Sequence, residues 1–295
     1  MSAVLVTGGA GFIGSHLCEK LLLEGKDVIC LDNFNDSYDP DVKWENIRCS
    51  VRHSGYKLIK GDILDRDLVD NIISSYGVDT VVHLAALAGV RKSIEAPIDY
   101  IDVDVKGTVL LLEACKKNKV GRFIFASSSS VYGNLKPPFR EDLQPDTQTS
   151  PYAAAKYSAE HFCRTYSLLY GIPVVCLRFF TVYGPRQRPD MAIHIFTKAI
   201  DEGKEVCIYG DGTSSRDYTY VDDIVSGIIG AMNLEYGYEV INLGNSRPVN
   251  IMELIGIIED KMGKKANIKL MPWQQGDMQA TCADLSKARD LLGYC

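Results

Sequence analysis

The sequence predicts an α/β protein built around a doubly wound parallel sheet. Short apolar runs typical of buried strands alternate with longer segments in which apolar residues recur at helical spacing. A glycine-rich turn separates the first strand pattern from the first helical pattern. This regular alternation favours a parallel sheet, because parallel strands need crossover connections, usually helices.

The first strand pattern covers residues 3–6, and a helical period follows the glycine-rich turn. The second strand, residues 26–31, ends at Asp32, and residues 33–54 look irregular and polar. The strands expected after this are 56–59, 79–83, 122–126 and 173–178, and the helices between them are 65–76, 97–119 and 151–170. In such a sheet, ligands bind outside the carboxyl ends of the strands.

Gly8, Gly11 and Gly14 stand between the first strand and the first helix. Glycines there permit a tight turn, a close approach to a pyrophosphate and close packing of helix on strand. The helix N-terminus then faces the phosphates. Asp32 can accept hydrogen bonds from an adenosine ribose and would repel a 2′-phosphate, which favours NAD over NADP. The alternative is that Asp32 only caps a turn.

From residue 179 onward the chain has more Gly, Pro and Arg and shorter elements. We expect helices at 192–202, 221–234 and 250–262 and strands at 206–209 and 239–242, the last returning to the main sheet. The predicted division is an NAD-binding Rossmann domain of residues 1–180, with 219–245 returning to it, and a substrate-binding lobe of 181–218 and 246–295. The lobe is therefore smaller, C-terminal and interleaved with the sheet.

Tyr152 and Lys156 are four residues apart on a predicted helix that Ser150 can cap, with Pro151 in its first turn. They share one helix face, and a nearby cation favours the phenolate form of a phenol. Tyr152 is thus a candidate proton acceptor. Such a pair alone is common by chance, but a strand running into the hydroxyls of residues 127–130 precedes this one.

Composition narrows the function classes. The chain has 295 residues, is 46% hydrophobic and 24% charged, and has a net charge of −6, which argues against nucleic acid or an anionic membrane surface as partner. No apolar run approaches the roughly 20 residues of a membrane-spanning helix. Nine cysteines without a Cys-x-x-Cys motif predict reduced thiols in a cytoplasmic protein without a metal site. His83 is expected to pack at a strand end, because no partner ligand has suitable spacing.

These motifs together resemble the extended short-chain dehydrogenase/reductase family, across essentially the whole chain. The resemblance rests on residues 7–14, Asp62-Ile63, 83–86, Ser128 with Tyr152 and Lys156, and 216–218 with 221–223. Within that family, residues 31–40, 88–91, 126–133, 178–184 and 188–191 are most similar to the UDP-glucuronate 4-epimerases.

The resemblance implies NAD as cofactor, a UDP-sugar as substrate, and a role for each matching residue. The implied catalytic residues are Ser128, Tyr152 and Lys156. The implied cofactor-binding residues are Gly8, Gly11, Phe12, Ile13, Gly14, Asp32, Asn33, Asp62, Ile63, Leu84, Ala85, Ala86, Tyr152 and Lys156. The implied substrate-binding residues are Ser129, Ser130, Thr181, Arg188, Arg216 and Asp277, with Arg216 on the nucleotide phosphates and Asp277 toward the uridine ribose.

The implied reaction is 4-epimerisation of UDP-glucuronate to UDP-galacturonate through a 4-keto intermediate. That intermediate is a β-keto acid, so the site must hold its carboxylate rigidly to suppress loss of carbon dioxide. Ser129, Ser130, Thr181 and Arg188 are candidate donors, with Arg186 an alternative to Arg188.

Other functions remain open at this point. They are UDP-glucose 4-epimerase, nucleotide-sugar dehydratase or decarboxylase, and a non-catalytic dinucleotide sensor. Dehydratases and decarboxylases of the family carry acidic residues where this chain has Ser129 and Ser130, which disfavours both. A sensor would not need Ser128, Tyr152 and Lys156 together.

Two departures from the family pattern stand out. Asp104 replaces a usual Asn in the long helix, and the sequence ends at residue 295, where relatives usually carry a further helix. The resemblance also implies a homodimer in which the long helix and the Tyr152 helix pair with a second copy.

Overall fold

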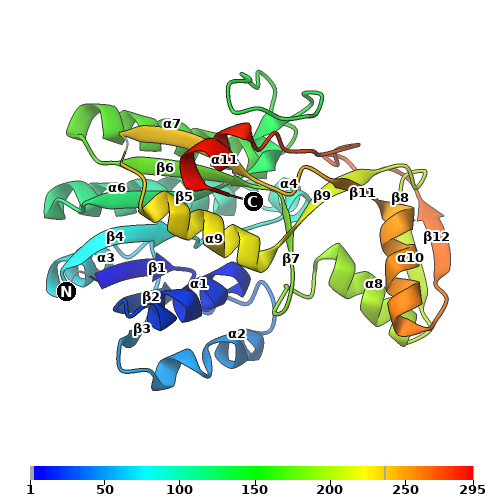
Figure 1. Cartoon of the computed structure of the whole chain (residues 1–295), viewed down its shortest axis with the longest axis horizontal. Coiled ribbons are helices and arrows are strands. Elements are labelled where there is room, and N and C mark those ends of the chain that lie inside the picture. The colour runs from blue at the N-terminus through cyan, green and yellow to red at the C-terminus, as the bar shows by residue number, and fades with distance from the viewer. Residues whose placement is uncertain (1–2, 236, 295) are drawn as a thin grey trace.

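The computed structural model describes residues 3–235 and 237–294, and its centre is a seven-stranded sheet in the order β10-β6-β5-β4-β1-β2-β3 (Figure 1). Every neighbouring pair in this sheet is parallel, which confirms the predicted fold class. The strands are β1 Ala3–Thr7, β2 Val28–Asp32, β3 Tyr56–Lys60, β4 Val78–His83, β5 Arg122–Ser128, β6 Val174–Phe179 and β10 Tyr238–Leu243. β1, β2 and β6 are buried along their whole length, because helices cover both faces of the sheet.

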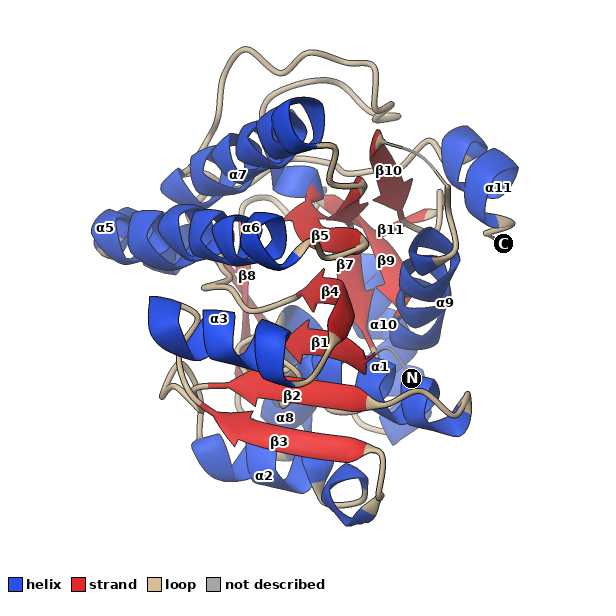
Figure 2. Cartoon of the chain, turned by 90° about the vertical axis from the view of Figure 1, so that its left-hand side faces the viewer, coloured by secondary structure: helices blue, strands red, loops and turns tan. Residues whose placement is uncertain are grey.

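The two faces carry separate helices (Figure 2). One face is covered by α3 Arg66–Ser75, α6 Gly107–Asn118 and α7 Pro151–Tyr170, and the other by α1 Phe12–Leu23 and α9 Val221–Met232. Each face has its own apolar core: Leu17 and Ile228 belong to one, and Ile72 and Leu111 to the other. The last helix, α11 Ser286–Leu292, packs against α9 and β10, on the side of the large sheet.

A smaller lobe stands beyond the carboxyl edge of the sheet (Figure 1). It contains the three-stranded sheet β11-β9-β7, the parallel pair β8-β12 and the helices α8 and α10. Their bounds are β7 Thr181–Tyr183, β8 Glu205–Tyr209, β9 Ser215–Tyr220, β11 Pro248–Asn250, β12 Asn267–Met271, α8 Ala192–Asp201 and α10 Ile251–Met262. The lobe has its own core around Phe196, Ile208 and Ile255. The exact division into two domains stays a prediction.

The structure corrects the sequence analysis in the region predicted to be irregular. Residues 33–54 contain α2 Pro40–Ile47 and a short 3-10 turn, Ser50–Arg52. Asp39 caps α2 by accepting a hydrogen bond from the Asp41 amide, and Pro40 occupies the first turn. Both are recognised helix-start signals, so the sequence did contain evidence for this helix.

The predicted helix 97–119 is interrupted. It consists of α5 Pro97–Tyr100, a π-helical turn Ile101–Lys106 and then α6, and it is preceded by the unpredicted helix α4 Val90–Glu95. The strands β7, β9, β11 and β12 were also not predicted. β7 and β11 have three residues each, too few to show a period of two.

Residues 3–235 and 237–294 contain no helix that is both long and apolar enough to cross a bilayer. The same part of the chain has no group of three His, Cys, Asp or Glu side chains arranged to hold a metal ion.

Candidate active site

A cavity of about 680 Å³ lies along the carboxyl edge of the large sheet, within the usual size range of ligand pockets. Its wall includes every residue predicted to bind the cofactor and all three predicted catalytic residues. It also includes four of the predicted substrate-binding residues, Ser129, Ser130, Thr181 and Arg188. The predicted site is therefore one continuous space, with a cofactor end at the glycine turn and a sugar end near Thr181.

The cofactor end begins at the glycine turn. Gly8 has φ +69°, and a Cβ there would lie 2.8 Å from the Ala85 amide nitrogen, so only glycine fits. A Cβ on Gly14 would overlap the Gly8 carbonyl, so this glycine lets α1 lie directly against the turn. Gly11 precedes α1 and gives it no side-chain cap, and the first-turn residues Phe12 and Ile13 line the cavity. An uncapped helix N-terminus facing a cavity fits a pyrophosphate.

Asp32 is 6% exposed at the end of β2 and lines the cavity. Its carboxylate accepts hydrogen bonds from the amides of Ala10 (3.1 Å) and Phe34 (2.9 Å), so it also shapes the turn that follows. Asp32 therefore stabilises a turn, as one interpretation of the sequence expected, and also lies at the cavity wall, where the other interpretation places the adenosine ribose. Nearby, the side-chain amide of Asn33 donates to the Asp62 carboxylate (2.9 Å), and both residues line the same end of the cavity.

Lys43, on α2, was missed by the sequence analysis. Its ammonium is buried 3.4 Å from the Asp32 carboxylate and donates to Asn35 at 3.0 Å, and it also lines the cavity. The Asp39-Pro40 start signal of α2 could have revealed it, because this helix is what brings Lys43 to the cavity wall.

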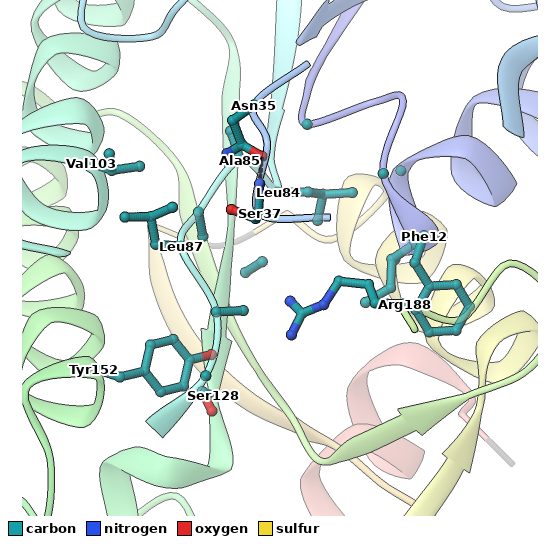
Figure 3. A pocket seen from close by; sticks show the side chains of 18 of the residues that line it. Phe12, Asn35, Ser37, Leu84, Ala85, Leu87, Val103, Ser128, Tyr152 and Arg188 are labelled. Atoms are coloured by element: carbon teal, nitrogen blue, oxygen red, sulfur yellow. Dashed lines mark hydrogen bonds between the residues drawn. The ribbon is translucent and has the colours of Figure 1, made fainter. Parts of the chain in front are cut away.

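The candidate catalytic residues come from two elements. Ser150 caps α7 by accepting a hydrogen bond from the Ala153 amide (3.1 Å), as predicted, and this helix presents Tyr152 and Lys156 to the cavity. Ser128, the last residue of β5, lies beside Tyr152 (Figure 3). Its hydroxyl accepts from the Ser130 amide and donates to the Ser130 hydroxyl, both at 3.1 Å.

His83 ends β4, and its ring is buried between Thr7 (2.8 Å) and Thr108 (3.1 Å). Burial lowers the pKa of His83 to about 3, with Lys156 acting in the same direction, so the ring is neutral. This is the predicted strand-end packing role.

At the sugar end, Arg188 extends into the cavity and its guanidinium faces the side that holds Tyr152 and Ser128 (Figure 3). It pairs in a bidentate way with Asp190, at 3.0 and 3.1 Å. Arg186 points elsewhere, since it binds Glu19 (2.8 Å) and Ser15 (3.3 Å) of α1 and does not line the cavity. Of the two candidate arginines, Arg188 lines the cavity, whereas Arg186 connects its loop to α1 through hydrogen bonds.

The structure does not bring Arg216 and Asp277 into this cavity. Arg216, on β9, donates to the carbonyls of Ser215 (2.9 Å) and Gln279 (3.4 Å). Asp277 pairs with Arg91 at 3.2 Å. Their roles toward the nucleotide stay predictions.

Comparisons with known proteins agree with this geometry. The family model described as the NAD dependent epimerase/dehydratase family matches residues 4–244. A UDP-glucuronate 4-epimerase of Thermodesulfobacterium geofontis is 45% identical over 295 residues, covering 100% of this chain and 91% of that protein.

Two solved structures are also similar. One is a UDP-glucuronic acid 4-epimerase from Bacillus cereus in complex with UDP-glucuronic acid and NAD, with a TM-score of 0.94 and 41% identity over 99% of this chain and 93% of that one. Another is a UDP-glucose 4-epimerase from Thermotoga maritima with UDP-glucose, with a TM-score of 0.91 and 35% identity over 99% and 93% of the two chains.

The fold and the cavity thus define an enzyme of the dinucleotide-binding α/β class. The chain belongs to the NAD dependent epimerase/dehydratase family. The predicted family, the enzyme class and NAD as the family's cofactor are confirmed.

Proposed function

We propose that this protein is an NAD-dependent UDP-sugar 4-epimerase whose substrate is UDP-glucuronate. The observation that supports this best is the meeting of Tyr152, Lys156 and Ser128 with Arg188 in one cavity, with Ser129 and Ser130 where a dehydratase or decarboxylase would need carboxylates. The similar proteins support the 4-epimerase part of this proposal, and they include proteins named for UDP-glucuronate and for UDP-glucose.

The cofactor end is assigned to NAD. The glycine turn and the first turn of α1 would hold the pyrophosphate, Asp32 the adenosine ribose, and Asp62 with Ile63 the adenine. Lys156 would hold the nicotinamide ribose. When bound, NAD accepts a hydride from sugar carbon 4 and returns it to the opposite face.

Tyr152 takes the proton from the hydroxyl on carbon 4 and later gives it back, so the reaction has no net oxidation. Ser128 hydrogen-bonds to the same oxygen and orients it. Lys156 is on the same helix and its side chain is buried, and its positive charge favours the phenolate that accepts the proton. Between the two proton transfers the flat 4-keto sugar must turn over inside the cavity.

Arg188 is assigned to the sugar carboxylate. A guanidinium matches a carboxylate in a planar, bidentate pair, and Arg188 already forms one with Asp190. Ser129, Ser130 and Thr181 line the same region and can donate further hydrogen bonds. Held by several groups, the carboxylate keeps its carbon–carbon bond out of alignment with the neighbouring carbonyl, and decarboxylation is suppressed.

We also propose a homodimer formed by the α5–α6 region and α7. Both segments expose apolar side chains, which are Ile98 and Ile101 on one and Phe162, Leu168 and Leu169 on the other. Exposed apolar surface of this kind marks interaction sites. Light scattering of the purified protein would give twice the chain mass for a dimer, and the single-chain mass would contradict the proposal.

Incubation with UDP-glucuronate and with UDP-glucose, separately and with NAD present, tests the substrate assignment. We expect separation of the products to show UDP-galacturonate from the first and far less conversion of the second. Faster conversion of UDP-glucose would move the assignment to the neutral hexose. Product lacking the carboxyl carbon would indicate a decarboxylase.

A further inference from the structure

Asp104 is a buried carboxyl that the proposed chemistry does not use. It lies on the π-helical turn Ile101–Lys106, and its side chain is 0% exposed. One oxygen, Oδ1, accepts a hydrogen bond from the Leu87 amide at 2.8 Å. The other, Oδ2, has no hydrogen-bond partner within residues 3–235 and 237–294 and lies 3.9 Å from the Lys156 ammonium.

The π turn explains this placement. A π turn shifts the side chains after it relative to a regular helix, and such turns are frequent at functional sites. Here the Asp104 carbonyl accepts from the Thr108 hydroxyl (2.6 Å), and Thr108 contacts the buried His83. With Oδ1 bound to the Leu87 amide and Oδ2 beside Lys156, the carboxylate lies between α7 and the loop after β4. An asparagine could make the same bond to Leu87, so the special property of Asp104 is its charge.

The titratable and charged groups around this carboxylate come from several elements. Lys156 on α7 lies 3.9 Å from it, and Tyr100 on α5 feels its charge and packs edge-on against Tyr152. The neutral His83 on β4 contacts Thr108, one turn after Asp104, and Arg188 and Asp190 from the loop before α8 act on Tyr100. Lys156 is the cation in contact with it, and Lys156 is also the residue assigned to favour the Tyr152 phenolate.

We propose that Asp104 is a positioning residue whose carboxylate partly neutralises Lys156 and so raises the pH at which Tyr152 gives up its proton. The inference rests on the proposed role of Tyr152. A bare ammonium beside the phenol would make the phenolate very stable, and a very stable phenolate is a weak proton acceptor. A carboxylate behind the ammonium restores basicity to the phenolate.

The sign of the effect follows from the charges. Burial raises the pKa of Asp104 to about 6, and Lys156 and the Leu87 amide oppose that rise. Above this pH the carboxyl is anionic and weakens the field of Lys156 at the phenol. A neutral residue at this position leaves the full positive field, so the phenolate should form at lower pH.

The test is a pH titration of tyrosinate ultraviolet absorption in the NAD-bound protein without sugar. Subtracting the curve of the matching Tyr152→Phe protein isolates the Tyr152 phenol. Asp104→Asn should lower the midpoint by roughly one pH unit, the order of magnitude expected when one charge is removed from a partly buried site. Asp102→Asn is the matched control, because it removes the same charge from the same turn at an exposed position paired with Lys106. It should leave the midpoint unchanged.

Asp104→Ser is a second neutral variant and should shift the midpoint in the same direction. An unchanged or raised midpoint in Asp104→Asn, or opposite shifts in the two variants, would overturn the proposal. Failure of both variants to fold would do so too, because Asp104 would then be needed for structure. The titration uses no sugar, so its failure is distinct from failure of the epimerase assignment, which product analysis decides.

Discussion

The two ends of the cavity are built in different ways. At the cofactor end, the part facing the pyrophosphate is backbone, from the glycine turn and the first turn of α1, and side chains such as Asp32 and Asp62 lie beyond it. The sugar end is mainly side chains, which are brought together from the end of β5, from β7 and from the loop before α8. A site made of backbone N–H groups keeps the same hydrogen-bond donors when side chains are substituted. A site made of side chains can lose or change its ligand through one substitution. We therefore expect the cofactor end to be alike in enzymes that act on different sugars, and the sugar end to determine which substrate binds.

Tyr152 stands where the two ends meet, and its loss should have the largest effect. Tyr152→Phe keeps the ring but removes the proton acceptor, so turnover should fall by about 10²- to 10⁴-fold. Binding of NAD and of the nucleotide sugar should change little, as calorimetry would show. Near-normal turnover in this variant would remove Tyr152 from the mechanism.

The sugar end should respond to Arg188→Ala in a substrate-dependent way. Removing one partner of a buried charge pair costs roughly 2–5 kcal/mol, so UDP-glucuronate binding should weaken by that amount. UDP-glucose has no carboxylate and should lose much less. The remaining turnover should also release more carbon dioxide, because a loosely held carboxylate can rotate into alignment at the keto stage.

Two dissociation constants and the ratio of decarboxylated to epimerised product measure this effect. Arg186→Ala is the control, since that side chain binds Glu19 of α1 and does not line the cavity. Equal losses for both sugars with an unchanged product ratio would make Arg188 structural and would favour a neutral hexose as substrate.

The cofactor end should respond to a single methyl group. Gly14→Ala places a Cβ on the backbone of the glycine turn, which cannot move aside as a side chain can. Overpacking of this kind costs roughly 1–3 kcal/mol, and we expect weaker NAD binding and a lower melting temperature. Gly256→Ala in α10 is the matched control, because nothing lies within 4 Å of its Cβ position and alanine favours the helix. A Gly14→Ala protein with unchanged stability and NAD affinity would show that close packing of α1 is not required.

The smallest expected effect is the choice between NAD and NADP. The buried Asp32 carboxylate would repel a 2′-phosphate, but Lys43 beside it offsets part of that charge. We expect NAD to bind at least about tenfold more tightly than NADP, or roughly 1.4 kcal/mol. Equal affinities for NAD and NADP, measured by fluorescence titration, would show that Asp32 does not discriminate between the two cofactors.

Sequence reasoning worked best where one local pattern determines a structure. The buried strands of the large sheet are short apolar runs, α7 has a Ser150-Pro151 start signal, and the residues of the glycine turn follow one another closely in the chain. It was weakest where position depends on distant contacts: Arg216 and Asp277 were predicted to bind the substrate, yet neither lines the cavity. The sequence preferred Arg188 to Arg186, and the contacts of Arg186 with Glu19 and Ser15 agree with that preference. The π turn at Asp104 leaves no recognisable pattern in the sequence, so the direction of the Asp104 side chain could not be predicted.

The place of β10 in the sheet has a consequence for how the protein is made. β10 borders β6 at one edge of the sheet, yet it is separated from β6 in the chain by β7, α8, β8 and β9 of the smaller lobe and by α9. On the ribosome, the first six strands emerge well before the strand that covers the edge of β6 and before α9 covers its share of the apolar face. An open strand edge invites pairing with other chains. Until residues 221–243 emerge, that edge of β6 has no partner strand, and a fragment ending at residue 180 would expose it permanently.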